Sequence, residues 1–444
     1  MKPSGRVQAA GSVLVWSSSK AHIAETVRAI CQTVATKARR SAIFQARPWR
    51  CKRIETGVGS GYGPYIFFVE ARYQLAQSSK TGAIVQMLWP VSTFEPGESH
   101  MFRESDLLKR LVALATTGPQ VIEGVADQDD GAVIAMPDGY DICATTDFVR
   151  GTGFSLFQLG HLTLRDLGRY VVAANVSDLA AMGANPFFYL SVVRYQSDRS
   201  LEEVEEILRG ISEACVDFHC PLVGGDSGSY SRDVLSGTAI GILPRGKRLS
   251  RKALRPGDVL LASGELGGAA AALAAANSDL QAVVADDFEK ALQRWRSPEP
   301  RVALGKALVN LPARIACMDI SDGLTASLQQ LSKITGLGFA VDAKALPVAH
   351  CVNSIAESLA IDAINLACSA SVDFELLIGC APQDVDLVLR VARDLATRVT
   401  PIGVAETGGL IRMTRADGHL YEHLPGVPWD HQMDDISRLF HAKG

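Results

Sequence analysis

The sequence lacks the patterns that define several common classes of protein. Its 444 residues include nine cysteines but no Cys-x-x-Cys pair, so neither a zinc-ribbon site nor a dithiol redox motif is indicated. His161, His219 and His350 do not have metal-ligand spacing, and no Ser-His-Asp pattern is recognisable. No apolar run is long enough to cross a bilayer. We therefore expect a cytoplasmic protein with reduced thiols and no membrane partner.

Acidic residues are scarce at the start of the chain and abundant afterwards. Residues 1–100 contain 13 Lys and Arg but 5 Asp and Glu, whereas the remainder contains 31 and 43. The net charge of −4 argues against a nucleic-acid partner. The composition changes near Met101. Residues 1–100 fit a targeting segment poorly. Two other interpretations are a small extra domain and an over-extended reading frame whose true start is Met101. We assign this part no function.

One alanine-rich stretch, Val171 to Pro186, organises the remaining sequence. It predicts a closely packed helix that stops at Gly183, and Asp178 is its only charged residue. A carboxylate among Ala, Val and Leu side chains requires a cation or a hydrogen-bond donor, because burying it alone is costly. This helix is therefore predicted to lie at a site.

Four further acidic motifs could meet Asp178. Three of these motifs follow runs that predict strands, so their acids are expected at strand ends. The fourth motif precedes a short strand, and a predicted hairpin turn separates that strand from the next motif. Any one of them, taken alone, could equally be a turn or a helix cap. Together they indicate converging carboxylates, which repel one another unless metal ions such as Mg²⁺ lie between them. The motifs are Asp127 to Asp130, Thr145 to Asp147, Gly224 to Asp226 and Asp319 to Gly323.

Two of these motifs also indicate phosphate binding. The glycines Gly224 and Gly225 before Asp226 would let the backbone approach a phosphate closely. Asp319 and Asp322 would sit together at the start of a helix, and metal plus phosphate explains such a pair better than a cap does. The hydrophobic periodicity predicts strands and helices in turn along the chain after Met101.

With these motifs in order, residues 104–431 resemble thiamine-monophosphate kinase, in the superfamily of aminoimidazole ribonucleotide synthetase and selenophosphate synthetase. The matching pieces are ESDLLKRL, DDGAV, TTD, NVSDLAAMGANP, GGD, SRKALRPGD, DISDGL, DFELL and PWDH. The resemblance implies an α/β (α+β) class with two α/β domains, which we place at residues 101–250 and 251–444 after an unassigned extension of residues 1–100. The N-terminal domain would pair into a dimeric β-barrel, and ATP with Mg²⁺ would bind between the domains. The implied reaction passes the γ-phosphoryl of ATP directly to a phosphorylated small molecule, thiamine monophosphate, without a covalent intermediate.

The resemblance also assigns site residues. Metal-binding positions would be Asp130, Thr145, Thr146, Asp147, Asp178, Asp226, Asp319 and Asp322. The nucleotide contacts would be Phe218, Gly225, Asp226, Arg251 and Ser321. The catalytic residues would be Asp226, Arg251 and Asp319. Asp373 and Trp429 would contact the acceptor.

The departures from the family pattern fall on the acceptor side. Gly153 stands where the family has a substrate-binding His, and Val372 stands where it has a Glu. The sequence therefore leaves the acceptor open. Two alternative hypotheses are a related ATP-dependent enzyme with a different acceptor and a non-catalytic regulator that binds ATP.

Overall fold

A computed structural model describes residues 121–123, 127–129, 131–136, 139–149, 151–278 and 284–427, and the backbone of two earlier strands. The chain divides into two compact units, residues 1–101 and 102–444. In the first unit, β1 (Phe67–Gln74) and β2 (Ile84–Val91) pair antiparallel. The predicted site residues Asp130 and Trp429 lie outside the described residues.

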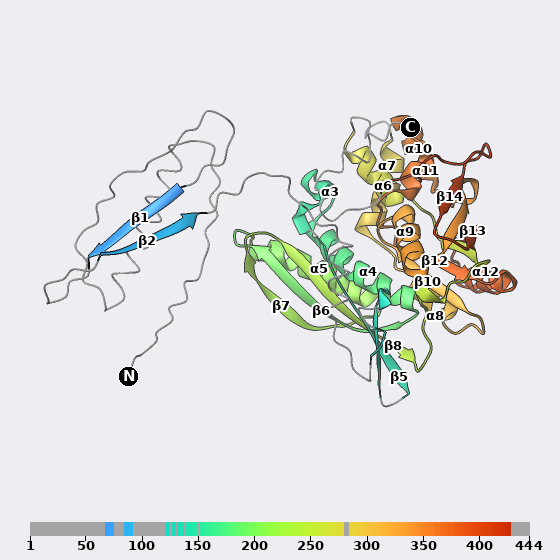
Figure 1. The fold of residues 1–444 in the computed structure, drawn as a ribbon, viewed down its shortest axis with the longest axis horizontal. Coiled ribbons are helices and arrows are strands. Elements are labelled where there is room, and N and C mark those ends of the chain that lie inside the picture. Colours follow the sequence, from blue (N-terminus) through green and yellow to red (C-terminus); the bar gives the residue numbers. More distant parts are fainter. Residues whose placement is uncertain are drawn as a thin grey trace. The chain divides into compact units, whose positions relative to one another are not determined.

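The second unit contains a six-stranded sheet in the order β3-β4-β5-β8-β6-β7. Figure 1 labels β5, β8, β6 and β7 of this sheet. All neighbouring strands are antiparallel except β6 and β7, which are parallel. Buried and less buried residues alternate along β8, as expected for a sheet with one face packed on a core. The strands are β3 (Val121–Glu123), β4 (Ala132–Ala135), β5 (Tyr140–Val149), β6 (Asn185–Gln196), β7 (Leu222–Tyr230) and β8 (Val234–Pro244).

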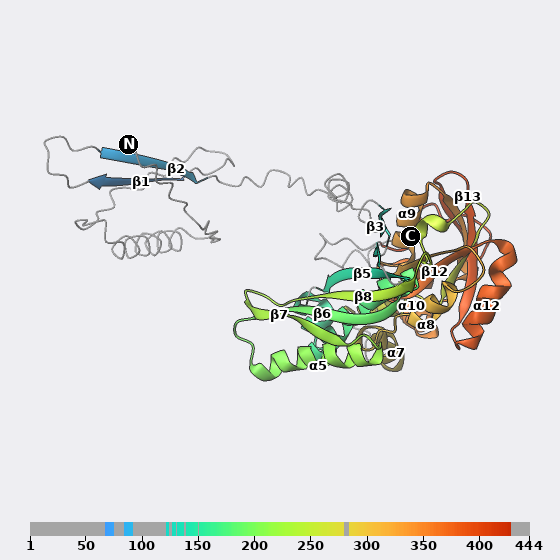
Figure 2. The ribbon, with the colours of Figure 1, turned by 90° about the horizontal axis from the view of Figure 1, so that it is seen from below.

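Helices α4 (Leu164–Met182) and α5 (Leu201–Asp217) lie on one face of this sheet (Figure 2). Thr163 and Asp166 form a capping box at the start of α4, and Gly183 ends it in the left-handed conformation. The two helices cross closely because each has a glycine at the crossing. A Cβ at Gly168 would lie 2.2 Å from the carbonyl oxygen of Ile207.

A second six-stranded sheet follows, in the order β10-β12-β9-β13-β11-β14, with only β11 and β14 parallel. Its strands are β9 (Val259–Ser263), β10 (Ile315–Ile320), β11 (Gly338–Asp342), β12 (Glu375–Cys380), β13 (Val399–Glu406) and β14 (Ile411–Thr414). Its helices are α6 (Gly268–Ala276), α7 (Ala285–Arg296), α8 (Val302–Leu308), α9 (Leu324–Thr335), α10 (His350–Leu359), α11 (Ala363–Cys368) and α12 (Val385–Asp394). The short helix α3 (Ser155–Gln158) precedes α4.

Helix α4 joins the two sheets. It packs on β5 and β8 of the first sheet and on α8 and β10 of the second. A Cβ at Gly305 of α8 would lie 2.0 Å from the carbonyl oxygen of Ala180, so glycine is required for this approach. The predicted central helix is therefore present, and it begins at Leu164, before the predicted start at Val171.

The expectation that the acid stands at a strand end is wrong for two of the three motifs to which it applied. Asp147 lies within β5, and Asp226 lies within β7, which runs on to Tyr230. Strand β7 is the edge of the sheet, and nearly all its residues are exposed. An exposed edge strand has no buried face to impose an alternating apolar pattern, so its length could not be read from the sequence.

Candidate active site

Polar side chains of α4 tie both sheets to the same place. Asn175 accepts the backbone N–H of Asp147 through its side-chain oxygen at 2.9 Å, and its carbonyl accepts the hydroxyl of Thr145 at 2.9 Å. Two residues later, Ser177 Oγ donates to Asp319 Oδ2 at 2.8 Å. Asn175, Ser177 and Asp319 are all buried. Helix α4 therefore fixes β5 and the end of β10 relative to each other.

The negative charges of three predicted acids act on one buried hydroxyl. Burial, followed by the negative charges of Asp147, Asp322 and Asp319, raises the pKa of Tyr170 well above its ordinary value. Asp319 is buried, Asp322 and the neighbouring Asp178 of α4 are half-buried, and Asp147 is exposed. We call Asp147, Asp319 and Asp322 the acidic centre. It combines one carboxylate fixed in the interior with others open to solvent.

An aromatic group borders the acidic centre. Tyr170 stacks on Trp295 with ring centroids 5.7 Å apart and lies 5.6 Å from Phe374. Phe154, which follows the turn after β5, meets Tyr170 and Trp295 edge-on at 5.4 Å. Phe154 is half-buried, whereas the other three rings are buried. The side of the acidic centre that faces the turn after β5 is therefore aromatic.

The acidic turn before β4 is held by the segment that follows β8. Arg251, a predicted nucleotide contact, donates its backbone N–H to Asp129 at 3.1 Å and its guanidinium to the carbonyl of Gln128 at 3.3 Å. Lys252 pairs with Asp127 at 2.8 Å. Arg251 is buried. The structure thus brings Arg251 next to the predicted metal-binding turn, with its guanidinium 3.8 Å from the Asp129 carboxylate.

Asp226 lies apart from the acidic centre within one chain. Gly225, the residue before Asp226, pairs with Ser191 of β6, which pairs with Gly237 of β8, which in turn pairs with Asp147 of β5. The backbones at Gly225 and Asp147 are therefore three strand spacings apart, or about 14 Å. The exposed Asp226 pairs with Arg194 at 2.5 Å, and this hydrogen bond lowers the pKa of Asp226.

Other predicted residues have structural contacts. Gly225 has φ of +154°, and a Cβ there would lie 1.9 Å from the carbonyl oxygen of Ser191, so packing alone requires a glycine. Phe218 forms the C-cap of α5 and packs on the core. Thr146 donates its hydroxyl to the carbonyl of Gly237 at 2.7 Å. Ser321 is half-buried in the turn between β10 and α9.

Asp373 caps a helix. Its buried carboxylate accepts the backbone N–H groups of Gly267 at 2.7 Å and Ala269 at 3.4 Å, at the start of α6. Burial raises the pKa of Asp373 despite these bonds. Gly153 is exposed, and Val372 packs against the hydrophobic core. Contact of Asp373 with an acceptor stays a prediction.

Sequence reasoning missed Tyr170, Asn175 and Ser177. The latter two had a readable signal, because they are polar residues on the apolar helix that carries Asp178. Tyr170 had none, since its role depends on which acids meet it in space.

The oxygen donors present suit Mg²⁺. Carboxylates are its preferred protein ligands, and it usually keeps several waters or takes substrate phosphate oxygens in place of a complete protein cage. Among the residues described, no group of three or more His, Cys, Asp or Glu side chains is positioned to hold a metal ion. Binding of Mg²⁺ at the acidic centre therefore stays a prediction, in which waters or phosphate oxygens complete the coordination shell.

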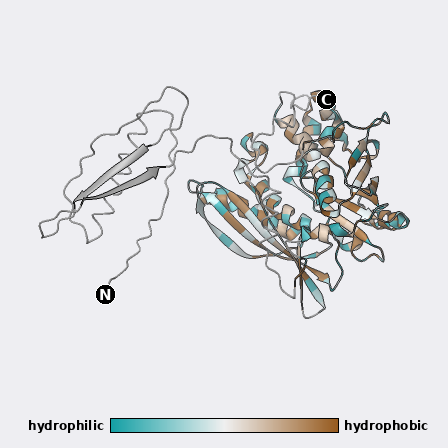
Figure 3. Ribbon diagram, in the orientation of Figure 1, coloured by the Kyte–Doolittle hydropathy of each residue, from teal (hydrophilic) through white to brown (hydrophobic). Residues whose placement is uncertain are grey.

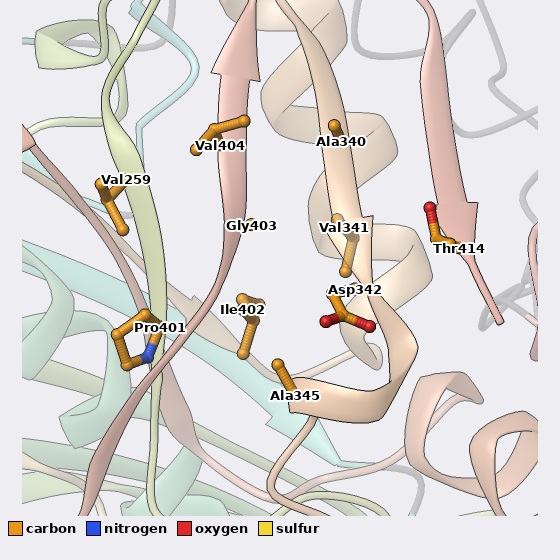
Figure 4. A pocket seen from close by; sticks show the side chains of 10 residues that line it. All are labelled: Val259, Ala340, Val341, Asp342, Ala345, Pro401, Ile402, Gly403, Val404 and Thr414. Atoms are coloured by element: carbon orange, nitrogen blue, oxygen red, sulfur yellow. The ribbon is translucent and has the colours of Figure 1, made fainter. Parts of the chain in front are cut away.

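A separate groove of about 420 Å³ lies on the second sheet, over β9, β11 and β13 (Figure 4). Its one carboxylate, Asp342, accepts the backbone N–H of Lys344. None of the predicted site residues lines it, so its size does not make it the reaction site.

In the part of the chain that the structure describes, no helix is long and apolar enough to span a membrane.

Comparison with known proteins decides the family. The sequence matches the N-terminal domain of AIR synthase related proteins at residues 128–243 and their C-terminal domain at residues 255–415. The thiamine-monophosphate kinase of Methanopyrus kandleri is 35% identical over 283 residues, which are 64% of this chain and 85% of that protein. The chain belongs to the thiamine-monophosphate kinase family.

Solved structures of this kinase family share its fold. The thiamine-monophosphate kinase of Stenotrophomonas maltophilia K279a has a TM-score of 0.55 and 29% identity, over 72% of this chain and 97% of the other. The structure of AaThiL complexed with AMPPCP and TMP has a TM-score of 0.60 and 23% identity, over 75% and 100%. The predicted family and two-domain α/β fold are confirmed. The residue boundaries, the dimeric barrel and the absence of a nucleic-acid partner stay predictions.

Proposed function

We propose that this protein is a thiamine-monophosphate kinase, which transfers the γ-phosphoryl group of ATP to the phosphate of thiamine monophosphate and yields thiamine diphosphate and ADP. The observation that carries the proposal is the acidic centre, which α4 assembles from both sheets in a member of this kinase family. A protein of the same fold has been solved with AMPPCP and TMP.

The reaction joins two anionic phosphates, so the site must offset their repulsion and align them. Asp147, Asp178, Asp319 and Asp322 would hold Mg²⁺, with Asp130 as a further ligand. When bound, the metal supplies the positive charge that the phosphates require. Ser177 fixes the direction of the Asp319 carboxylate. A phosphate oxygen is already a nucleophile, so no strong base or covalent intermediate is needed.

The aromatic side of the site suits the acceptor. Thiamine carries a cationic thiazolium ring and a flat pyrimidine, and both are favoured next to aromatic faces. We propose that the half-buried Phe154 contributes acceptor contacts in place of those that are lost with Gly153 and Val372.

We further propose that the protein is a cytoplasmic homodimer. The strands of the first sheet carry large exposed apolar side chains, interspersed with polar ones (Figure 3). Exposed apolar side chains on a sheet face favour association with another protein surface. Pairing two copies of this face would close the predicted barrel. The exposed residues include Phe148, Phe187, Val192, Val223 and Tyr230.

The test is turnover by the full chain with ATP and Mg²⁺, with and without thiamine monophosphate, while ADP and thiamine diphosphate are quantified together. The proposal predicts equal amounts of both products and little ADP without the acceptor. ADP formation that is independent of thiamine monophosphate would indicate another acceptor. Binding of Mg·ATP with no turnover under either condition would support the regulator instead.

A further inference from the structure

The hydroxyl of Tyr170 is a polar group that the fold itself does not use. Tyr170 lies on α4 and is buried, with 8% of the residue exposed. Its hydroxyl forms no hydrogen bond with any residue that the structure describes. A polar group in a buried side chain normally has a partner, and leaving it without one costs free energy. Tyr170 is therefore a candidate for a role beyond packing.

A second tyrosine in the same core shows the usual arrangement. Tyr189 of β6 is fully buried, and its hydroxyl donates to the carbonyl of Val171 on α4 at 3.3 Å. The side-chain amide of Asn175 donates to the same hydroxyl at 3.5 Å. The hydroxyl of Tyr189 therefore helps to hold β6 on α4, whereas the hydroxyl of Tyr170 has no such function.

The hydroxyl of Tyr170 is not sealed in the interior. In the described part of the chain, three side-chain atoms are both shut off from solvent and without a hydrogen-bond partner, and they belong to Glu123, Asp141 and Arg248. The unpartnered oxygen of Tyr170 is not among these atoms, so it keeps access to solvent. A ligand that replaces this solvent can therefore reach the hydroxyl.

Acids from both sheets act on this hydroxyl. Asp147 belongs to β5 of the first sheet, Asp319 belongs to β10 of the second, and Asp322 lies in the turn that follows β10. Burial, and then the charges of these three acids, raise the pKa of Tyr170 well above its ordinary value, so the hydroxyl keeps its proton at neutral pH. It is therefore a neutral donor beside the acidic centre.

Three aromatic neighbours hold the ring of Tyr170 in place. Trp295 stacks on it with ring centroids 5.7 Å apart, and Phe374 lies 5.6 Å from it. Phe154 meets it edge-on at 5.4 Å. Phe154 is the half-buried member of this group and the proposed acceptor contact. Tyr170 thus adjoins both the aromatic side of the site and the acidic centre.

We propose that the hydroxyl of Tyr170 donates a hydrogen bond to the phosphate of the acceptor and so selects a phosphorylated acceptor over an unphosphorylated one. This assignment rests on the proposed function, in which the acceptor phosphate lies between the aromatic side and the metal. A hydrogen bond to an anionic oxygen is about twice as strong as one between neutral groups. A lysine or arginine at this position would pair with the acids, whereas a neutral hydroxyl stays available to the phosphate.

Melting temperatures measured without ligands test the assignment apart from catalysis. Tyr170→Phe removes the hydroxyl and keeps the ring, and it should melt at or above the temperature of the parent, because no hydrogen bond within the protein is lost. Tyr189→Phe is the matched control, which loses the bond to Val171 and should melt at a lower temperature. Tyr170→Phe protein that melts as low as Tyr189→Phe would show that the hydroxyl has a partner in the protein, which contradicts the proposal.

Steady-state kinetics of the full chain with ATP and Mg²⁺ tests the contact itself. Tyr170→Phe should lower kcat/KM for thiamine monophosphate roughly ten- to a hundredfold, because a hydrogen bond to a charged group is lost. The KM for ATP should not change, and Tyr189→Phe should have the kcat/KM of the parent. Thiamine, which lacks the phosphate, should inhibit the parent and Tyr170→Phe equally well as a competitor of thiamine monophosphate.

Two kinetic results would overturn the assignment while leaving the proposed function intact. One is a kcat/KM of Tyr170→Phe equal to that of the parent. The other is an equal weakening of thiamine and thiamine monophosphate, which would place the contact on the rings of the acceptor. A parent that forms no thiamine diphosphate would instead overturn the proposed function, and the assignment with it.

Discussion

The hydrogen bond from Ser177 to Asp319 connects the two sheets through α4, and Ser177→Ala removes it. Both residues are buried, and the donor and acceptor are 2.8 Å apart. A buried hydrogen bond to a charged group contributes about 1.5–3 kcal/mol. We expect Ser177→Ala to lower the free energy of unfolding by about 2 kcal/mol, which for a unit of this size is about 3 °C in melting temperature.

The assay is thermal unfolding in EDTA, with Ser358→Ala as the matched control. Ser358 is also a helical serine, but its hydroxyl donates to the carbonyl of Ser354 in its own helix. The control should therefore lose no more than about 0.5 kcal/mol. In turnover assays, Ser177→Ala should also require more Mg²⁺, since the Asp319 carboxylate is less well oriented. Equal stability of the two variants would refute the view that this bond ties α4 to the second sheet.

Three further predictions follow from the same contacts. Gly210→Ala should destabilise the protein by about 2–3 kcal/mol in urea unfolding, because its Cβ would lie 2.0 Å from a carbonyl of α4. Gly409→Ala should not, because its Cβ would meet only Ser332 Oγ, at an ordinary contact distance of 3.9 Å. Burial acts to raise the pKa of the Asp233 carboxyl, but the hydrogen bonds that it accepts, from Arg199 among others, outweigh burial and lower its pKa. Asp233→Asn should therefore be less stable than the parent at pH 7, and the difference should vanish only below about pH 4; a constant difference at lower pH would contradict this. Asp319→Asn should remove most Mg²⁺-dependent binding of ATP in calorimetry, and unchanged binding would show that the acidic centre is misplaced.

Local sequence chemistry was sufficient to predict a helix that carries Asp178. Its alanine content indicated the helix and Gly183 its end, whereas the polar residues beside Asp178 that contact β5 and β10 were not recognised. The earlier start at Leu164 was readable too, because Thr163 and Asp166 have capping-box spacing. These features depend on residues that are neighbours in the sequence.

The arrangement of the strands could not be predicted in this way. Asp147 and Asp226 have similar motifs, yet β8 and β6 lie between their strands, and nothing in either motif encodes that order. Asp373 illustrates a second limit, since a buried helix cap and a ligand-binding acid have the same local sequence. Only the packing of α6 against this turn distinguishes them.

The most direct test of the central claim is to follow the γ-phosphoryl group itself, with γ-labelled ATP, Mg²⁺ and thiamine monophosphate. The account predicts that the label appears in thiamine diphosphate at the rate of ADP formation, with none bound covalently to the protein. Label that appears only as inorganic phosphate, at the same rate with and without thiamine monophosphate, would contradict the account.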